Sequence, residues 1–278
     1  SGSKLYVTHQ HGVGILRYRL GEETNIQGVE YRQSLTFKDV KVSFHPAGHV
    51  LGSSQIRMEY KGEVWVVSGD YKYQYDPTCE PLEPVPCHTF ITESTFGLPL
   101  YKFAPGAETV SEIHKWWQDC REENGTALIL AYSLGKAQRI LAHLKDDYLD
   151  LPGPIYTHGS VAAINAIYEA SGVELAPSKY LSADIPRSEL AGALVVAPPG
   201  AADSTWSRRF PNLSSAFASG WMLVRGIKRR RGLSRGFVLS DHADWTGLLS
   251  VIEATGAERV LVTHGNTNAL VRYLSEVK

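Results

Sequence analysis

Potential metal ligands come directly after three runs that predict β-strands. They are His49 after Val40 to Phe44, Asp70 after Val64 to Ser68, and His264 after Arg259 to Val262. Neutral imidazoles and carboxylates are donors that zinc accepts, and one carboxylate can bridge two ions through its two oxygens. A single histidine or aspartate at the end of a strand is most often a turn or capping residue. The coincidence of three such residues favours a metal site over that explanation.

Two further residues have the types and positions expected of catalytic groups. Glu93 follows the strand-like run Thr89 to Thr92, and His242 follows the run Gly236 to Leu239. A carboxylate that orients a histidine can hold it as a general acid or as a stabiliser of developing phosphate charge. Asp244, close to His242, is better explained as the N-terminal cap of the helix predicted after it.

The elements that must position these residues change in character along the chain. Short β-rich runs separated by glycine and polar turns fill the first third, and prolines place residues 76–86 in a surface connection. From residue 107 onward, helical and strand-like runs alternate. The predicted helices cover Val110 to Trp117, Lys136 to Leu144, Val161 to Ser171 and Leu248 to Thr255, and the predicted strands cover Ala127 to Ala131, Ile155 to Thr157 and Ala193 to Ala197. This alternation is typical of a parallel α/β sheet.

Composition excludes several classes of protein. Of the 278 residues, 43% are hydrophobic, and 28 basic residues balance 29 acidic ones, so the chain can bury a large core and is not disordered over its bulk. The apolar runs are too short to cross a bilayer. The odd set of cysteines, Cys79, Cys87 and Cys120, cannot form a disulfide framework for such a chain and is more natural in a reducing compartment. We therefore expect a cytoplasmic protein with no membrane partner.

Nucleic-acid binding would require a local basic patch, because a formal net charge of −1 provides no bulk attraction. Basic side chains could neutralise phosphates, either in a charged turn or at the N-terminus of a helix. The candidates are Lys136, Arg225, Lys228, Arg229, Arg230 and Arg231. Trp206, Trp221 and Trp245 could add stacking on bases. A solvated basic turn and tryptophans in the core explain the same residues without any ligand.

Taken together, these segments resemble the metallo-β-lactamase superfamily, and within it the β-CASP nucleases. The resemblance covers nearly the whole chain and is greatest to bacterial ligase-associated DNA exonucleases, also described as mRNA 3′-end processing factor-like. Several motifs in the order of the family carry it, which is a much stronger signal than any one of them. They are the stretch from His45 to Ser53, Val66 to Lys72, Thr92 to Gly97, Ala131 to Gln138, Gly236 to Trp245, and Thr263 to Gly265.

The resemblance implies an αββα metallo-β-lactamase sandwich into which a β-CASP α/β domain is inserted. Residues 1–104 and 236–278 would form the two parts of the metallo-β-lactamase domain, and residues 105–235 would form the β-CASP domain. It also implies that His49, Asp70 and His264 bind two zinc ions, with Asp70 bridging them at the catalytic centre. Glu93 and His242 correspond to the acidic residue and the histidine that assist phosphodiester cleavage.

One feature of the family is absent from this sequence. A His-x-His-x-Asp-His motif that supplies most of the zinc ligands precedes the region where this sequence starts, and His9 and His11 imitate only half of it. The chain also opens directly in the strand-like run Lys4 to Thr8, without an initiating Met, so we expect native residues upstream. With this ligand set alone, we expect metal binding and activity to be partial or lost.

These features predict a zinc-dependent phosphodiesterase, with DNA exonuclease activity in DNA repair as the first hypothesis. Its partners would be single-stranded or end-containing DNA and, by the resemblance, a DNA ligase and a helicase. An RNA-processing nuclease with an RNA substrate is one alternative. A catalytically silent nucleic-acid-binding or scaffold protein is another. The length of the inserted domain and the basic cluster disfavour a small-molecule hydrolase.

Overall fold

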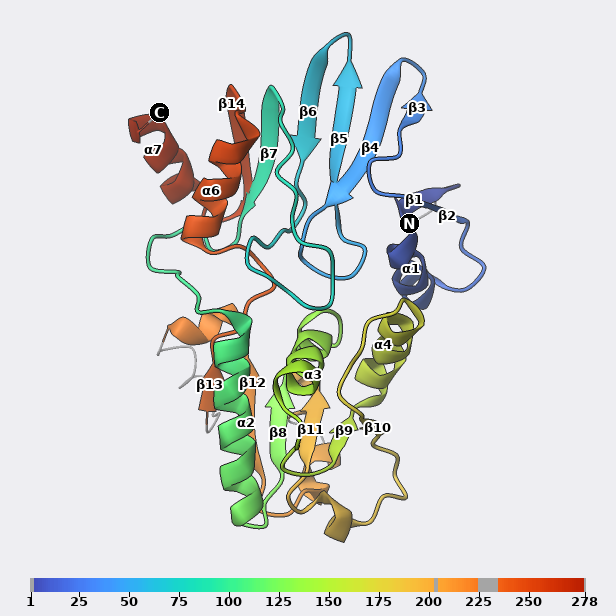
Figure 1. The fold of residues 1–278 in the computed structure, drawn as a ribbon, viewed down its shortest axis with the longest axis vertical. Helices are drawn as coiled ribbons and strands as arrows, with labels where there is room; N and C mark the ends of the chain where they lie inside the picture. The colour runs from blue at the N-terminus through green and yellow to red at the C-terminus, as the bar shows by residue number, and fades with distance from the viewer. Residues whose placement is uncertain (1–2, 203–204, 225–234, 278) are drawn as a thin grey trace. The chain divides into compact units, whose positions relative to one another are not determined.

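The computed structural model describes residues 3–202, 205–224 and 235–277 (Figure 1). The chain folds into two compact units, the first formed by residues 1–102 and 241–278 and the second by residues 103–240. The second unit is therefore a continuous stretch of sequence between the two parts of the first. Helices combined with two parallel sheets and one mixed sheet confirm the expected α/β class. The domain boundaries near residues 104 and 235 stay a prediction.

A mixed six-stranded sheet forms the centre of the first unit, in the order β14-β7-β6-β5-β4-β3. β3 to β6 form an antiparallel meander, whereas β7 is parallel to both β6 and β14. The strands are β3 (Leu35–Phe37), β4 (Val40–Pro46), β5 (Ser54–Tyr60), β6 (Glu63–Val67), β7 (Thr89–Ser94) and β14 (Arg259–Gly265). The proline-rich residues between β6 and β7 form neither helix nor strand, as predicted.

Two helices that follow the second unit in the sequence cover the core of this sheet. α6 (Trp245–Thr255) begins where Oδ1 of Asp244 accepts a hydrogen bond from the N–H of Gly247 at 2.8 Å, which confirms the predicted cap. α7 (Thr267–Val277) follows β14. One apolar cluster joins β6, β7 and both helices through side chains that include Val66, Phe90, Leu248, Val251 and Leu270. The alternating apolar residues of the strands and the periodic ones of the helices therefore face one core.

The N-terminal segment forms a small parallel pair of strands. β1 (Tyr6–His9) pairs with β2 (Ile26–Val29), and between them lie a short 3-10 helix, η1 (Gln10–Gly12), and α1 (Val13–Leu20). The predicted strand at residues 4–8 is found here, with small shifts of its ends.

The second unit contains a six-stranded sheet in the order β10-β9-β11-β8-β12-β13. Neighbouring strands of this sheet pair in parallel over the described residues. The strands are β8 (Ala127–Leu130), β9 (Ile155–Thr157), β10 (Lys179–Tyr180), β11 (Leu194–Ala197), β12 (Ser214–Ala218) and β13 (Arg235–Phe237). The helices are α2 (Gly106–Glu122), α3 (Lys136–Asp147) and α4 (Gly159–Ala170), with the 3-10 segments η2 (Arg187–Leu190), η3 (Pro199–Ala201), η4 (Thr205–Arg209) and η5 (Gly220–Leu223). This confirms the predicted alternation of helices and strands.

Several elements carry too weak a local signal to be predicted. The strands β2, β3 and β10 have two to four residues each, and β12 is built largely from serine and alanine. Such segments become strands because a neighbouring strand offers them hydrogen bonds, not through intrinsic preference. Within residues 3–202, 205–224 and 235–277, no helix is both long and apolar enough to span a membrane.

Candidate metal centre

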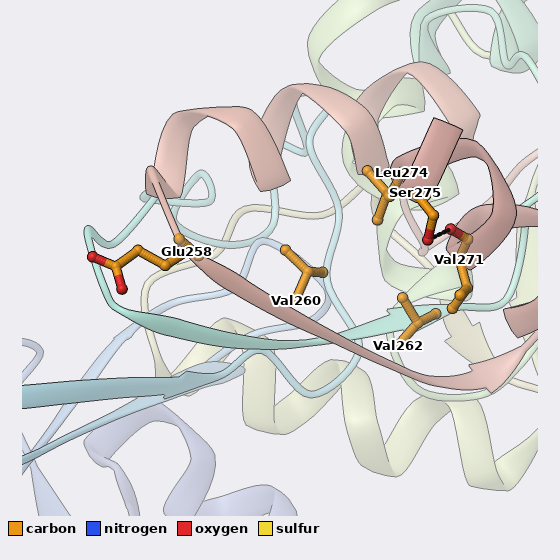
Figure 2. A pocket seen from close by; sticks show the side chains of 7 residues that line it. Glu258, Val260, Val262, Val271, Leu274 and Ser275 are labelled. Atoms are coloured by element: carbon orange, nitrogen blue, oxygen red, sulfur yellow. Dashed lines mark hydrogen bonds between the residues drawn. The ribbon is translucent and has the colours of Figure 1, made fainter. Parts of the chain in front are cut away.

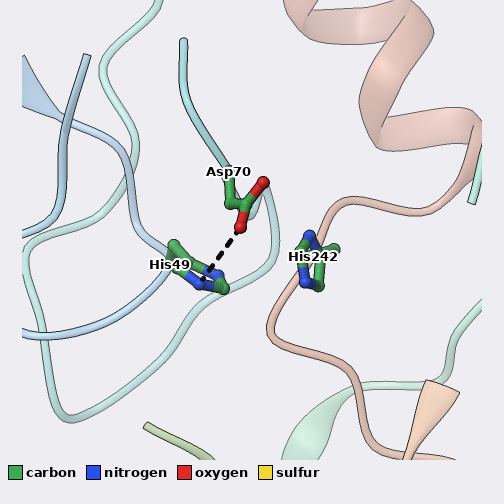
Figure 3. Close-up of side chains that lie close together, drawn as sticks. All are labelled: His49, Asp70 and His242. Carbon is green, nitrogen blue, oxygen red and sulfur yellow. Dashed lines mark ion pairs between the residues drawn. The ribbon is translucent and has the colours of Figure 1, made fainter. Parts of the chain in front are cut away.

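Three of the predicted residues lie together in the first unit. The side chains of His49, Asp70 and His242 each offer a ligand atom, and these atoms lie within 4.8 Å of one another (Figure 3). Nε2 of His49 is 3.9 Å from Oδ2 of Asp70, and the centroids of the two imidazole rings are 4.8 Å apart. Among the residues that the structure describes, this is the one group of three or more such side chains that could hold a metal ion.

The directions of the strands explain why these residues meet. β4 and β6 both run antiparallel to β5, which lies between them, and β7 runs parallel to β6. The carboxyl ends of β4, β6 and β7 therefore lie at the same edge of the sheet. His49 and Asp70 follow the first two of these strands, and Glu93 lies near the end of the third. His242 reaches the same edge from the segment that precedes α6.

A tight turn holds the backbone of His49. Gly48 and Gly52 have φ angles of 70° and 72°, and a Cβ atom on Gly48 would lie 2.5 Å from the carbonyl oxygen of Lys72. Only glycine combines a left-handed backbone with so close an approach. Oγ of Ser53 accepts a hydrogen bond from the N–H of His49 at 3.1 Å. The glycines of this loop therefore place the imidazole after β4.

Both imidazole rings are anchored through Nδ1. Nδ1 of His49 lies 2.8 Å from the carbonyl oxygen of Asp241, and Nδ1 of His242 lies 3.0 Å from each carboxylate oxygen of Glu93. Histidines that bind metals usually donate their other ring N–H to a carbonyl or carboxylate in this way, which leaves Nε2 for the metal. Nε2 of His49 and the carboxylate of Asp70 are donors that zinc accepts, and the imidazole of His242 lies beside them.

Glu93 and His242 form a largely buried pair. Burial raises the pKa of Glu93, but the hydrogen bond and charge of His242, with hydrogen bonds from Thr95 and the N–H of Tyr71, outweigh burial and leave the pKa lowered. Burial lowers the pKa of His242, but the hydrogen bond and negative charge of Glu93 outweigh it, so the pKa of His242 is raised. The arrangement is a carboxylate that holds a proton-retaining imidazole in one orientation.

The structure leaves His264 apart from the other predicted ligands. This residue is exposed near the end of β14 and has a φ of 53°. Its carbonyl oxygen accepts a hydrogen bond from the hydroxyl of Ser94, which fastens β14 to the end of β7. The group formed by the described residues His49, Asp70 and His242 does not include it. Its role as a zinc ligand stays a prediction.

The histidines near the N-terminus have other partners. His9 is 2% exposed and its ring stacks on Tyr31, with centroids 3.6 Å apart. Nδ1 of His11 lies 3.6 Å from Oε1 of Glu80. The aromatic contact therefore buries His9.

The candidate nucleic-acid contacts have mixed outcomes. Lys136 is 3% exposed at the start of α3, and its Nζ lies 4.8 Å from the centroid of the Tyr132 ring. Trp245 is 7% exposed and belongs to the core of the first unit, so it cannot stack on a base there, whereas Trp221 is 37% exposed. Trp206 packs edge-to-face on Phe210. The basic residues Arg225, Lys228, Arg229, Arg230 and Arg231 lie outside the described residues.

Several buried residues that hold the site in place were not predicted from the sequence. Tyr71 is fully buried and its N–H donates to Oε1 of Glu93 at 2.9 Å. Lys72 is 1% exposed, and Thr95 hydrogen-bonds the other oxygen of Glu93. The available signal was an aromatic residue and a lysine directly after Asp70, where a strand end would ordinarily lead into small polar turn residues.

A second hollow of the first unit lies between β14 and α7 (Figure 2). It has a volume of about 300 Å³ and is lined by Ala257, Glu258, Val260, Val262, Val271, Leu274 and Ser275. The hydroxyl of Ser275 donates to the carbonyl oxygen of Val271 at 2.9 Å, within α7. The lining is therefore mainly aliphatic, with Glu258 as its one carboxylate and no histidine.

Comparison with known proteins reveals relatives that share this sequence pattern. The chain is 32% identical over 240 residues to a protein named "Probable DNA ligase" from Opitutus terrae, a match that covers 86% of this chain and 23% of that protein. It is 32% identical over 143 residues to cleavage and polyadenylation specificity factor subunit 3 from Dictyostelium discoideum, covering 49% and 18% of the two chains. An RNase J-like protein from Methanocaldococcus jannaschii is 29% identical over 147 residues, covering 50% and 34%.

The relatives assign the chain to a family. No family model matches the sequence. One solved structure, of a protein of unknown function from Enterococcus faecalis V583, has the same fold with a TM-score of 0.64 over 96% of this chain and 74% of that one, at 12% identity. The chain belongs to the metallo-β-lactamase/β-CASP family. It spans less than a quarter of the length of the first two relatives.

Proposed function

We propose that this protein is a zinc-dependent phosphodiesterase of the nuclease type. In this proposal the first unit belongs to a metallo-β-lactamase αββα sandwich, and the second unit is the inserted β-CASP domain. The proposal rests on His49, anchored through Nδ1, lying beside the carboxylate of Asp70 and the imidazole of His242, because this arrangement brings metal-binding atoms and a positioned catalytic group together.

His49 and Asp70 would hold the metal, with His264 as the further predicted ligand. When bound, zinc supplies the positive charge that activates water and stabilises phosphoryl oxygens. The side chain of Asp70 is 47% exposed, so its carboxylate remains open to a substrate phosphate and to a second ion. These residues would hold a metal where a phosphodiester can approach from solvent.

His242 would act on the reacting phosphodiester. Glu93 fixes the imidazole through Nδ1, so Nε2 is the nitrogen that can donate a proton or hydrogen bond to the leaving oxygen. Phe96 lies against the same ring, with centroids 6.1 Å apart, and restricts its movement. A positioned general acid of this kind contributes about 10²- to 10⁴-fold to a hydrolysis rate.

DNA is the substrate that we propose, with an exonuclease activity in DNA repair. The relative named as a probable DNA ligase, whose match covers most of this chain, supports this choice and supports a ligase as a partner. A helicase partner rests on the family resemblance alone. RNA processing is the alternative, because other relatives are named as endoribonucleases.

The test combines metal analysis with a cleavage assay on labelled single-stranded DNA and RNA of the same sequence. It would use this chain and the version extended to its natural start. We expect bound zinc and cleavage of DNA by the extended version, with shortened products that reveal digestion from an end. Zinc without cleavage of either polymer, or no zinc in either version, would favour the silent nucleic-acid-binding alternative.

A further inference from the structure

Two exposed tyrosines lie on the loop that directly follows Asp70. Tyr73 is 52% exposed and Tyr75 is 69% exposed, although neighbouring Tyr71 is fully buried. A single exposed aromatic side chain on a surface needs no explanation. Here two occur within three residues of each other, and they come three and five positions after a proposed zinc ligand. The loop therefore exposes two aromatic side chains to solvent within five residues of Asp70.

Hydrogen bonds join the start of this loop to the segments that carry Glu93, His242 and His49. The N–H of Tyr71 donates to Glu93, and its carbonyl oxygen accepts from the N–H of Ala243, which follows His242, at 2.7 Å. The N–H of Lys72 donates to the carbonyl oxygen of Ala47, just before the His49 turn, at 3.0 Å. The backbone that leads to the two exposed rings is thus part of the framework that holds the site.

The buried side chain of Lys72 binds the backbone of the loop that carries the two tyrosines. Lys72 is 1% exposed, and its Nζ donates to the carbonyl oxygens of Gln74 at 2.9 Å and Tyr75 at 3.0 Å. The ammonium holds these backbone carbonyls, while the side chains of Tyr73 and Tyr75 remain exposed. Asp76, 4% exposed, ends the segment by accepting hydrogen bonds from the N–H and hydroxyl of Thr78. Both ends of the tyrosine segment are therefore held.

Such a segment suits one class of ligand. Tyrosine rings provide flat, partly apolar faces, and stacking on aromatic side chains is the usual way that proteins hold unpaired bases. Bases in a duplex are already stacked on each other, so their faces are not accessible to these tyrosine rings. A loop that is already fastened also loses little conformational entropy when a ligand binds. The one basic residue of the loop, Lys72, is turned inward, so phosphate contacts are not the main attraction here.

We propose that Tyr73 and Tyr75 form a stacking platform for the unpaired bases of a single-stranded nucleic acid beside Asp70. The proposal deepens the proposed function by naming how the substrate strand is held at the site. In this proposal the tyrosine rings contact the faces of the bases. The contacts predicted from the sequence were instead basic residues and tryptophans elsewhere in the chain.

Fluorescence anisotropy with a labelled thymidine oligonucleotide tests this directly on the 278-residue chain. The Tyr73→Ala/Tyr75→Ala variant should bind about tenfold or more weakly, whereas Tyr73→Phe/Tyr75→Phe should remain within about threefold of the unmodified protein. Tyr60→Ala is the matched control, because Tyr60 is 45% exposed at the other end of β5 and carries no proposed contact. Circular dichroism and thermal unfolding would verify that all variants fold alike.

A second ligand separates stacking from other effects of the substitution. An abasic oligonucleotide of the same length keeps the phosphates, so we expect the unmodified protein to bind it about as weakly as the double alanine variant binds the normal oligonucleotide. The salt dependence of binding should not change in the alanine variant, because no phosphate contact is removed. Equal binding of normal and abasic strands, an equal loss in Tyr60→Ala, or no binding by the unmodified chain would overturn the platform.

Failure of the platform and failure of the proposed function give different results. Hydrolysis of bis(p-nitrophenyl) phosphate and zinc content report on the metal centre, whereas anisotropy reports on the strand. Tyrosine-dependent binding without zinc or hydrolysis would support the platform and contradict the proposed enzyme. Zinc-dependent hydrolysis with strand binding that ignores the tyrosines would do the reverse.

Discussion

Glu93 holds His242 by both carboxylate oxygens, each 3.0 Å from Nδ1 of the ring, across 149 positions of sequence. Because Glu93 is itself 2% exposed and is held by Thr95 and Tyr71, the imidazole has one strongly preferred orientation. This relationship makes separate predictions possible for the catalytic and metal-binding parts of the site.

Replacement of His242 by alanine should reduce phosphodiester cleavage by about 10²- to 10⁴-fold while zinc content stays unchanged, since the proposal makes this residue a general acid. Glu93→Gln should cause a smaller loss of about 10- to 100-fold, because the ring remains but its orientation and charge balance weaken. Steady-state cleavage rates and metal analysis of the extended protein would measure both effects. Loss of zinc from the His242 variant would instead make His242 a ligand.

Replacement of Asp70 by asparagine should lower the zinc content and remove activity together. An amide lacks the negative charge that compensates the cation, and it is a poor bridge between two ions. Zinc per chain, measured by plasma mass spectrometry after dialysis, would show the change. Asp39→Asn is the control, because Asp39 is exposed before β4, at the end of that strand away from His49. An Asp70 variant that keeps its full zinc content would contradict the ligand assignment.

Gly48→Ala should destabilise the protein more than Gly62→Ala. Both glycines have positive φ, 70° and 85°, so each substitution costs about 1–2 kcal/mol of backbone strain. A Cβ atom on Gly48 would also meet the carbonyl oxygen of Lys72 at 2.5 Å, whereas nothing lies within 4 Å of one on Gly62. Urea unfolding followed by circular dichroism would give both free energies of unfolding. Equal losses would mean that the His49 turn accommodates the added atom without displacement.

The protein should lose stability in mild acid partly through His45. Burial lowers the pKa of this histidine below 6.5, against an opposing hydrogen bond from its Nδ1 to the carboxylate of Glu83, and Nε2 also contacts the hydroxyl of Ser43. The unfolded chain then binds the proton more readily than the folded one, so the free energy of unfolding is highest above pH 6.5 and falls as the pH drops below it.

Thermal unfolding at about pH 7.5 and about pH 5.5 would measure this contribution in the unmodified protein and in His45→Gln. Glutamine keeps hydrogen-bonding capacity but does not titrate, so the difference in melting temperature between the two pH values should shrink. An unchanged difference would mean that other groups account for the whole effect of acid.

Local sequence patterns were sufficient for most of the elements that carry the site. The strands that precede His49, Asp70 and His264, and the strand that contains Glu93, were predicted from apolar runs and turn residues, and the cap at Asp244 from its residue type. Elements with short or small-residue sequences, such as β12 and β2, were not predicted. Their hydrogen-bonding partners lie far away in the sequence and leave no periodic signal.

The support of the site was hidden for a similar reason. Nδ1 of His49 is satisfied by the carbonyl oxygen of Asp241, 192 positions later, and no side-chain pattern records which backbone carbonyl will stand there. The inward turn of Lys72 is equally invisible, because a lysine in a loop ordinarily extends into water.

The α/β class, the residue types available for zinc and phosphodiester chemistry, and their positions at strand ends could all be predicted from the sequence, because they depend on short-range periodicity and side-chain chemistry. The grouping of His49, Asp70 and His242 without His264 emerged only from the folded structure. The order and direction of the strands determine which strand ends meet at one edge of the sheet. Strand order in turn depends on packing and hydrogen bonds between segments that are distant in the sequence.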